Sequence, residues 1–110
     1  MSLVRVGALP DEPLSAAAQF YAAILPQLSP GTEALITLVF HPADHTHRAW
    51  RLAAVQNLAR RLAPIRVNAV ASADEAAIAA TARYLANAPG VTGQYLPLVE
   101  PVRPPGLIDP

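Results

Sequence analysis

The stretch ALITLVFHPADHTH (residues 34–47) decides the fold of this chain. Its first part, LITLVF, is an apolar run interrupted only by Thr37, and continuous apolarity predicts a strand buried on both faces of a parallel sheet. The strand runs directly into His41, and all 3 histidines of the chain lie between residues 41 and 47. Because ligands of open α/β sheets bind beyond the carboxyl ends of the strands, we expect any site to lie here.

The remaining elements alternate around this strand. Strands are expected at residues 3–9, 65–71 and 94–99, and helices at residues 14–25, 47–62 and from about 75 to 87. The last helix follows the sequence SADE, which predicts a capping box with Ser72 as the cap and Glu75 as its partner. The order β-α-β-α-β-α-β predicts an α/β fold with a small parallel sheet of about four strands and three helices. We expect one domain over residues 1–99 and a proline-rich extended tail over residues 100–110.

Composition excludes several classes of function. The formal net charge is zero and no basic stripe is visible, so we expect no nucleic-acid partner. The chain has no cysteine, and its basic residues are all arginine, which removes thiolate chemistry and every mechanism that needs a lysine. No apolar run approaches the ~20 residues of a membrane span. Because no signal peptide is evident either, we expect a cytoplasmic protein that does not contact a membrane.

Two helices lack the polar side expected of helices that face solvent. Residues 14–25 (LSAAAQFYAAIL) carry no charge, and residues 47–62 show two apolar stripes beside Arg48, Arg51, Arg60 and Arg61, which we assign to a polar edge. We therefore expect homodimerisation through both helices, with an exposed Ala/Ser/Gln strip as the alternative for the first. The predicted interface residues are Phe20, Tyr21, Ile24, Trp50, Ala54 and Leu58.

The histidine loop is the one constellation that suggests chemistry. Imidazoles and a carboxylate suit zinc, nickel or iron, so His41, Asp44, His45 and His47 are candidate metal ligands. His45 and His47 lie two residues apart rather than four, so a shared metal would need a non-helical loop or two subunits. Arg48 and Arg51 could help to hold an anion. The alternative is structural, with His41 filling the strand end and the other two histidines exposed or capping neighbours.

Two further motifs resemble the short-chain dehydrogenase/reductase family. LARRLAPIRVNAVA (residues 58–71) is similar to a helix, a corner and a strand of that family, and RYLANAPGVTGQYLPLV (residues 83–99) is similar to its closing helix and strand. The sequences of these motifs are close to those of the pteridine-reductase branch. The resemblance covers about three quarters of the chain and only the C-terminal half of the family's fold. It implies a Rossmann-like sheet and a homo-oligomer that pairs through the first two helices.

The departures from the family concern its chemistry. The family binds NAD(P) through a glycine-rich turn that is absent here, and the substrate lid after IRVNAVA is missing. Counting back from Pro64 places Asp44 and Arg48 where the family has its catalytic tyrosine and lysine, and the family's serine falls at about His41. These three residues are the candidates for a catalytic role, and neither Asp44 nor Arg48 can replace its counterpart.

The chain is therefore identified as a truncated, degenerate member of that family. We expect no cofactor and a non-enzymatic role as a homodimerisation module, or as a module that docks onto a full-length relative. One alternative is a small-molecule or metal-binding protein that uses the histidine loop. The other is a residual NAD(P)-dependent oxidoreductase whose nucleotide site a partner chain supplies.

Overall fold

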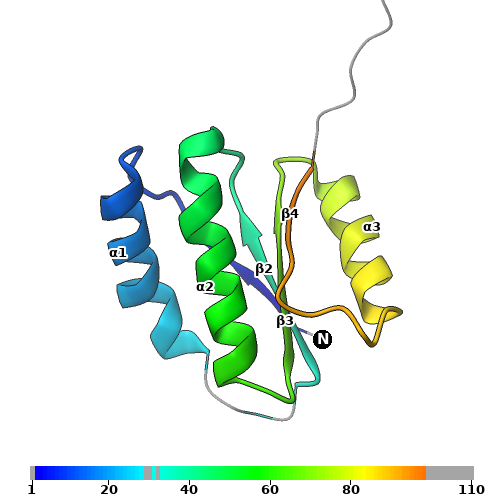
Figure 1. Ribbon diagram of the computed structural model, residues 1–110. Coiled ribbons are helices and arrows are strands. Elements are labelled where there is room, and N and C mark those ends of the chain that lie inside the picture. Colours follow the sequence, from blue (N-terminus) through cyan, green and yellow to red (C-terminus); the bar gives the residue numbers. More distant parts are fainter. Residues whose placement is uncertain (1, 29–30, 32, 99–110) are drawn as a thin grey trace, which may run out of the picture.

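The computed structural model describes residues 2–28, 31 and 33–98 as a four-stranded parallel sheet with three α-helices (Figure 1). The strands stand in the order β1-β2-β3-β4, which is also their order along the chain. The elements are β1 (Ser2–Arg5), α1 (Pro13–Ile24), η1 (Leu25–Gln27), β2 (Leu35–Phe40), η2 (His45–His47), α2 (Arg48–Arg61), β3 (Arg66–Ala71), α3 (Glu75–Ala86) and β4 (Tyr95–Pro97). The predicted α/β fold is confirmed.

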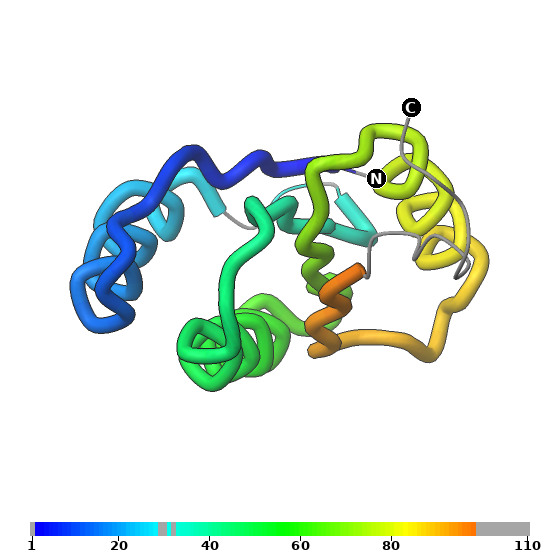
Figure 2. Tube along the Cα trace, turned by 90° about the horizontal axis from the view of Figure 1, so that it is seen from above, coloured from blue at the N-terminus to red at the C-terminus, as the bar shows by residue number. Residues whose placement is uncertain are grey.

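The helices form a layer on each side of the sheet. Figure 2 shows α1 and α2 on one face and α3 on the other. Two separate apolar clusters correspond to these faces, because alternate residues of a strand point to opposite sides. The cluster with Leu38 and Val67 packs against α1 and α2, whereas the cluster with Val39 and Val70 packs against Ile78 of α3.

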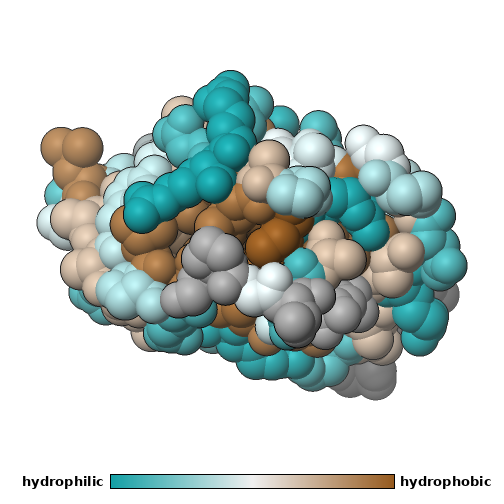
Figure 3. All heavy atoms as spheres, turned by 90° about the horizontal axis from the view of Figure 1, so that it is seen from below, coloured by the Kyte–Doolittle hydropathy of each residue, from teal (hydrophilic) through white to brown (hydrophobic). Residues whose placement is uncertain are grey.

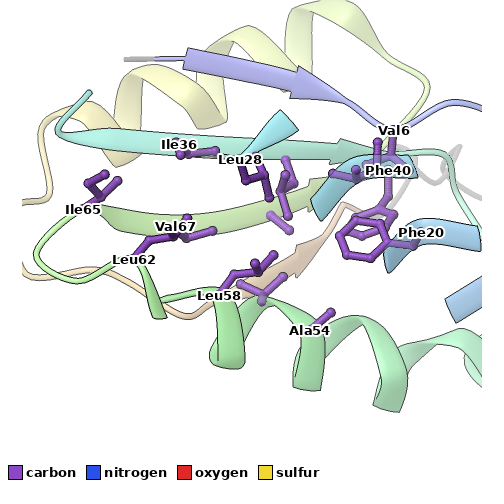
Figure 4. Close-up of a cluster of buried hydrophobic side chains, with 14 of the residues drawn as sticks. Val6, Phe20, Leu28, Ile36, Phe40, Ala54, Leu58, Leu62, Ile65 and Val67 are labelled. Carbon is purple, nitrogen blue, oxygen red and sulfur yellow. The ribbon is translucent and has the colours of Figure 1, made fainter. Parts of the chain in front are cut away.

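The strand β2 is the centre of the core, as its unbroken apolar run predicts. All six of its residues are buried, and it pairs with β1 on one side and β3 on the other. Its last residue, Phe40, stacks on Phe20 of α1 with ring centroids 5.4 Å apart (Figure 4). Trp50 of α2 contacts both rings, so aromatic side chains fix both helices against the carboxyl end of β2.

The two family-like motifs meet between β3 and β4. Asn68 is fully buried, donates a hydrogen bond to the Val91 carbonyl and accepts one from the Gln94 backbone N–H. Thr92 accepts a hydrogen bond from the Val67 N–H, and Gly93 adopts φ +74°, a conformation that side chains rarely tolerate. The Asn of IRVNAVA therefore fixes the path of the VTGQ loop into β4.

Several sequence-based expectations need correction. Ser72 does not cap α3; Asp74 does, because its carboxylate accepts hydrogen bonds from the Ala76 and Ala77 N–H groups, while Ser72 accepts one from the Asp74 N–H. The two predicted apolar stripes of α2 are not separate faces. Val55 belongs to one stripe and Leu58 to the other, and both pack into the same core cluster. The first strand ends at Arg5 rather than Leu9.

Residues 99–110 lie outside the described residues, and the predicted tail lies there with them. Among the described helices, none is long and apolar enough to cross a membrane.

Candidate functional site

A cleft of about 540 Å³ lies at the carboxyl ends of β1 and β2. Its walls are the loop from Gly7 to Asp11, the segment from Phe40 to Asp44, and the side chains of His47 and Arg51 at the start of α2. A smaller hollow of about 270 Å³ toward α3 shares Gly7, Phe40 and His41 with it. The cleft is therefore at the strand end where the sequence predicts a site.

Arg51 lies at the base of this cleft and is only 3% exposed. Its Nη1 donates hydrogen bonds to the His41 carbonyl (2.9 Å) and the Tyr95 hydroxyl (3.1 Å). Its guanidinium lies over the Phe40 ring, 4.5 Å from the centroid, and Nε is buried without a hydrogen-bond partner. The assignment of Arg51 to a polar edge is thus wrong. No carboxylate of the described residues forms an ion pair with it.

The spacing of Arg51 along the sequence predicts that it is buried, although its charge suggests a surface position. Arg51 precedes Ala54, Val55 and Leu58 by 3, 4 and 7 residues, the spacing of one helix face, and all three are buried. Arg51 therefore occupies a core position of α2.

The His47 side chain connects two segments of the chain and is not free to bind a metal ion. It is 5% exposed, its Nδ1 accepts a hydrogen bond from the Trp50 indole N–H (3.0 Å), and its Nε2 lies 2.9 Å from the Asp11 carbonyl oxygen. These two contacts assign a neutral ring with the proton on Nε2. Both ring nitrogens are engaged, so His47 ties the loop before α1 to the start of α2.

The other members of the histidine loop do not converge on one point. The side chains of His41 and His45 are exposed, and His41 contributes its carbonyl to Arg51. Asp44 caps η2 and accepts hydrogen bonds from the Thr46 hydroxyl and N–H, which lower the pKa of its carboxyl group. Within the described residues, no three His, Cys, Asp or Glu side chains lie close enough to share a metal ion.

The family's catalytic positions keep none of its catalytic geometry. His41 and Asp44 both line the cleft, but Asp44 is engaged as a cap, and Arg48 is the exposed first residue of α2 and does not line the cleft. At these three described positions, no phenol stands in the place of the tyrosine.

The N-termini of α1, η2 and α3 do not fit a dinucleotide. A pyrophosphate binds where backbone N–H groups at the start of a helix are free. Here Glu12 accepts hydrogen bonds from the Leu14 and Ser15 N–H groups, and these bonds lower the pKa of its carboxyl group. Asp44 and Asp74 occupy the starts of η2 and α3 in the same way. Each of these described helix starts carries its own carboxylate, which repels phosphate.

The predicted interface residues divide into two groups. Phe20, Ile24, Ala54 and Leu58 are buried in the core of the same chain, so a partner cannot reach them. Tyr21 is 36% exposed and Trp50 is half-buried. Of the six predicted interface residues, only Tyr21 and Trp50 are therefore accessible to a partner. Leu14 of α1, which was not among the predicted residues, is 80% exposed and is a further candidate.

A third hollow, at the opposite end of the sheet, is lined by Pro64 and Ile65, and Glu33 and Arg61 supply the charges in its lining. Figure 3 shows apolar side chains gathered near the middle of the face seen from below. It brings together no group of residues with evident chemistry.

Comparison with known proteins agrees with the fold and with the two motifs. A family model described as short chain dehydrogenase-like protein matches residues 4–98 of the 110-residue chain. No curated protein and no solved structure matches the chain.

Proposed function

This chain belongs to the short chain dehydrogenase-like family, and from that premise we propose that it is a non-catalytic homodimerisation module. It retains the part of the fold that pairs subunits, whereas the residues at the cleft do not fit the nicotinamide cofactor or the family's catalytic groups.

The observation that carries the proposal is the outer face of α1. This helix lies at the margin of its layer, beside α2, and buries only Ala16, Phe20 and Ile24 (Figure 2). None of its 12 residues is charged. Leu14 and Tyr21 are two of the four large hydrophobic side chains that the described residues expose. An uncharged surface with exposed large apolar groups is typical of a protein interface.

Charge and direction favour a second copy as the partner. Figure 1 shows that α1 and α2 run in the same direction. A twofold axis across the two helices makes them antiparallel to their counterparts in the second copy. The acidic start of α1, at Asp11 and Glu12, then lies near the arginine-bearing end of α2, at Arg60 and Arg61, in the other copy. The surface is therefore self-complementary in charge.

The size of the interface requires α2 as well as α1. A helix of 12 residues is about 18 Å long, which is short for an interface of about 1,600 Å². Ala49, Ala53 and Gln56 of α2 are also exposed and uncharged, so we propose that the interface extends onto them.

Sedimentation velocity and light scattering of the purified chain test the proposal. We expect a dimer at micromolar concentration, and we expect the double variant Leu14→Glu/Tyr21→Glu to be monomeric with an unchanged circular dichroism spectrum. Tyr84→Glu is the matched control, because Tyr84 is 61% exposed on α3, on the opposite face of the sheet. A stable monomer of the unaltered chain contradicts the proposal.

The alternatives have distinct outcomes. If the chain is a monomer that binds a full-length short-chain dehydrogenase, the alternative of docking onto a relative through the same helices is favoured over homodimerisation. A rise in melting temperature with NAD(H) or NADP(H) in the presence of such a partner would favour a residual reductase. We expect no such rise, because carboxylates occupy the starts of α1, η2 and α3.

A further inference from the structure

Arg51 carries a buried positive charge with which no carboxylate of the described residues forms an ion pair. Its hydrogen-bond partners are a carbonyl and a phenol, both uncharged, and the ion pair of the described residues joins Arg5 and Glu75 elsewhere. The rings of Phe40 and Trp50 attract the guanidinium, but neither ring holds a net charge. A buried charge without an opposite charge is costly, so such a group usually has a counterion.

The cleft gives a counterion access to this side chain. Arg51 forms part of the cleft wall, and Nη1 is the guanidinium nitrogen whose hydrogen bonds to protein atoms are described. Nε is buried without a partner and is out of reach of a ligand, whereas no hydrogen bond of Nη2 is described and Nη2 is not among the buried atoms without a partner. Nη2 therefore keeps N–H donors unused, and these suit a carboxylate oxygen.

We propose that the cleft binds a small apolar carboxylic acid in its ionised form, with the carboxylate paired to Arg51. Part of the lining suits an apolar ligand body, because Ala8, Leu9, Pro10, Pro42 and Ala43 present small or apolar side chains beside the polar groups of the cleft. A volume of about 540 Å³ accommodates a short aliphatic or monocyclic acid.

The charges around the cleft favour a monoanion over phosphate. Asp11 and Asp44 also line the cleft, and their carboxylates repel a doubly charged group more strongly than a singly charged one. Arg51 is the single arginine of the lining. This binding function goes beyond homodimerisation and is tested separately from it, because Leu14 and Tyr21, which the dimer test alters, do not line the cleft.

Nuclear magnetic resonance titration of the full chain tests the proposal. The probes are butyrate and benzoate, with butyramide, benzamide and inorganic phosphate as comparisons. We expect saturable shifts of the Arg51 Nε–H resonance and of backbone resonances between residues 7–11 and 41–44 with the acids. The amides have the same shape without the charge and should produce no saturation at the same concentrations.

Two pairs of variants distinguish binding in the cleft from non-specific attraction of the acids to the protein. Arg51→Met should weaken acid binding by about tenfold or more, the loss typical of a charged hydrogen bond. Arg60→Met removes an equal charge from an exposed residue of α2 and should leave binding unchanged. A Cβ added to Gly7 or Gly90 meets nothing within 4 Å, so Gly7→Leu should narrow the cleft and weaken binding, whereas Gly90→Leu should not.

The outcomes decide the matter even if Arg51→Met does not fold, because Gly7→Leu leaves Arg51 in place. Saturable binding of the acids that Gly7→Leu weakens supports the proposal. Absence of saturation at millimolar acid, equal binding of acid and amide, shifts confined to other surfaces, or tighter binding of phosphate than of the acids each overturn it.

Discussion

Asn68 and Arg51 are both buried polar side chains at the sheet, but their surroundings differ. Asn68, on β3, engages both its amide nitrogen and its amide oxygen with the loop that precedes β4. Arg51, on α2, has a fully buried nitrogen without a partner and no carboxylate beside it. The hydrogen bonds of Asn68 are satisfied within the chain and position β4. Those of Arg51 are not all satisfied by the described residues, and Arg51 lies in the wall of a cleft.

The difference separates a structural polar group from a candidate binding group. A buried group whose hydrogen bonds are all satisfied stabilises one conformation, whereas a buried group with unused donors costs free energy until a partner arrives. Asn68 therefore stabilises the connection into β4, whereas Arg51 supports the proposed ligand site in the cleft at the carboxyl ends of β1 and β2.

The largest expected effect is on the complete arrangement. Asn68→Ala should lower the free energy of unfolding by about 3 kcal/mol, because it leaves a carbonyl and an N–H of the β4 loop without their partner. Urea unfolding measures this loss. Asn57→Ala, which removes an exposed amide bonded to Arg60, is the control and should change the free energy by less than about 0.5 kcal/mol. Equal losses in the two variants would contradict the structural role of Asn68.

A smaller effect of opposite sign is expected at Thr37. Its hydroxyl is buried in β2 without a hydrogen-bond partner, as Nε of Arg51 is. Thr37→Val keeps the shape and removes the unsatisfied oxygen, so it should raise the free energy of unfolding by about 1 kcal/mol. Thermal and urea unfolding measure the gain. A loss of stability instead would show that the hydroxyl has a partner in solution.

The smallest effect concerns Asp44 at the rim of the cleft. Hydrogen bonds from Thr46 lower the pKa of its carboxyl group in the folded chain, so the stability it contributes is present above the ordinary carboxyl pKa of about 4. That contribution is lost as the pH falls through the lowered folded-state pKa. Asp44→Ala should therefore be less stable than the unaltered chain at pH 7, and the gap should close in acid.

Thr46→Val sharpens the same measurement. Because the Thr46 hydroxyl is the largest cause of the lowered pKa, its removal should move the acid loss of stability to higher pH. Urea unfolding across a pH series records the midpoint. An unchanged midpoint would mean that the hydroxyl does not contact the carboxylate in solution.

Much of the fold could be predicted from sequence because it depends on patterns that repeat along the chain. The unbroken apolar run of β2, the prolines that bound the helices and the motifs around Asn68 each predict an element or a connection that the structure confirms. Capping was harder, because Ser72 and Asp74 both suit a helix start and only the backbone geometry distinguishes them.

The candidate site was less predictable because it depends on where single side chains point. Three histidines in seven residues suggested a shared ligand, yet His47 bonds to Trp50 and Asp11 while His41 and His45 face solvent. Arg51 was assigned to the surface by its charge, although its spacing matches the buried face of α2. A periodic pattern predicts which face a residue occupies, but the partners of a buried polar group depend on contacts between distant segments.

The carboxylates at the helix starts also determine how this end of the molecule responds to its surroundings. Parallel α/β architecture directs the positive ends of its helix dipoles to one side of the sheet. Glu12, Asp44 and Asp74 offset that field at the starts of α1, η2 and α3, so these helix starts do not recruit anions from solution. Nucleotides and other polyanions should consequently be excluded there at low ionic strength, and added salt should weaken this exclusion. A dinucleotide site could be restored only by first removing these acids, which would also cost the helices their caps.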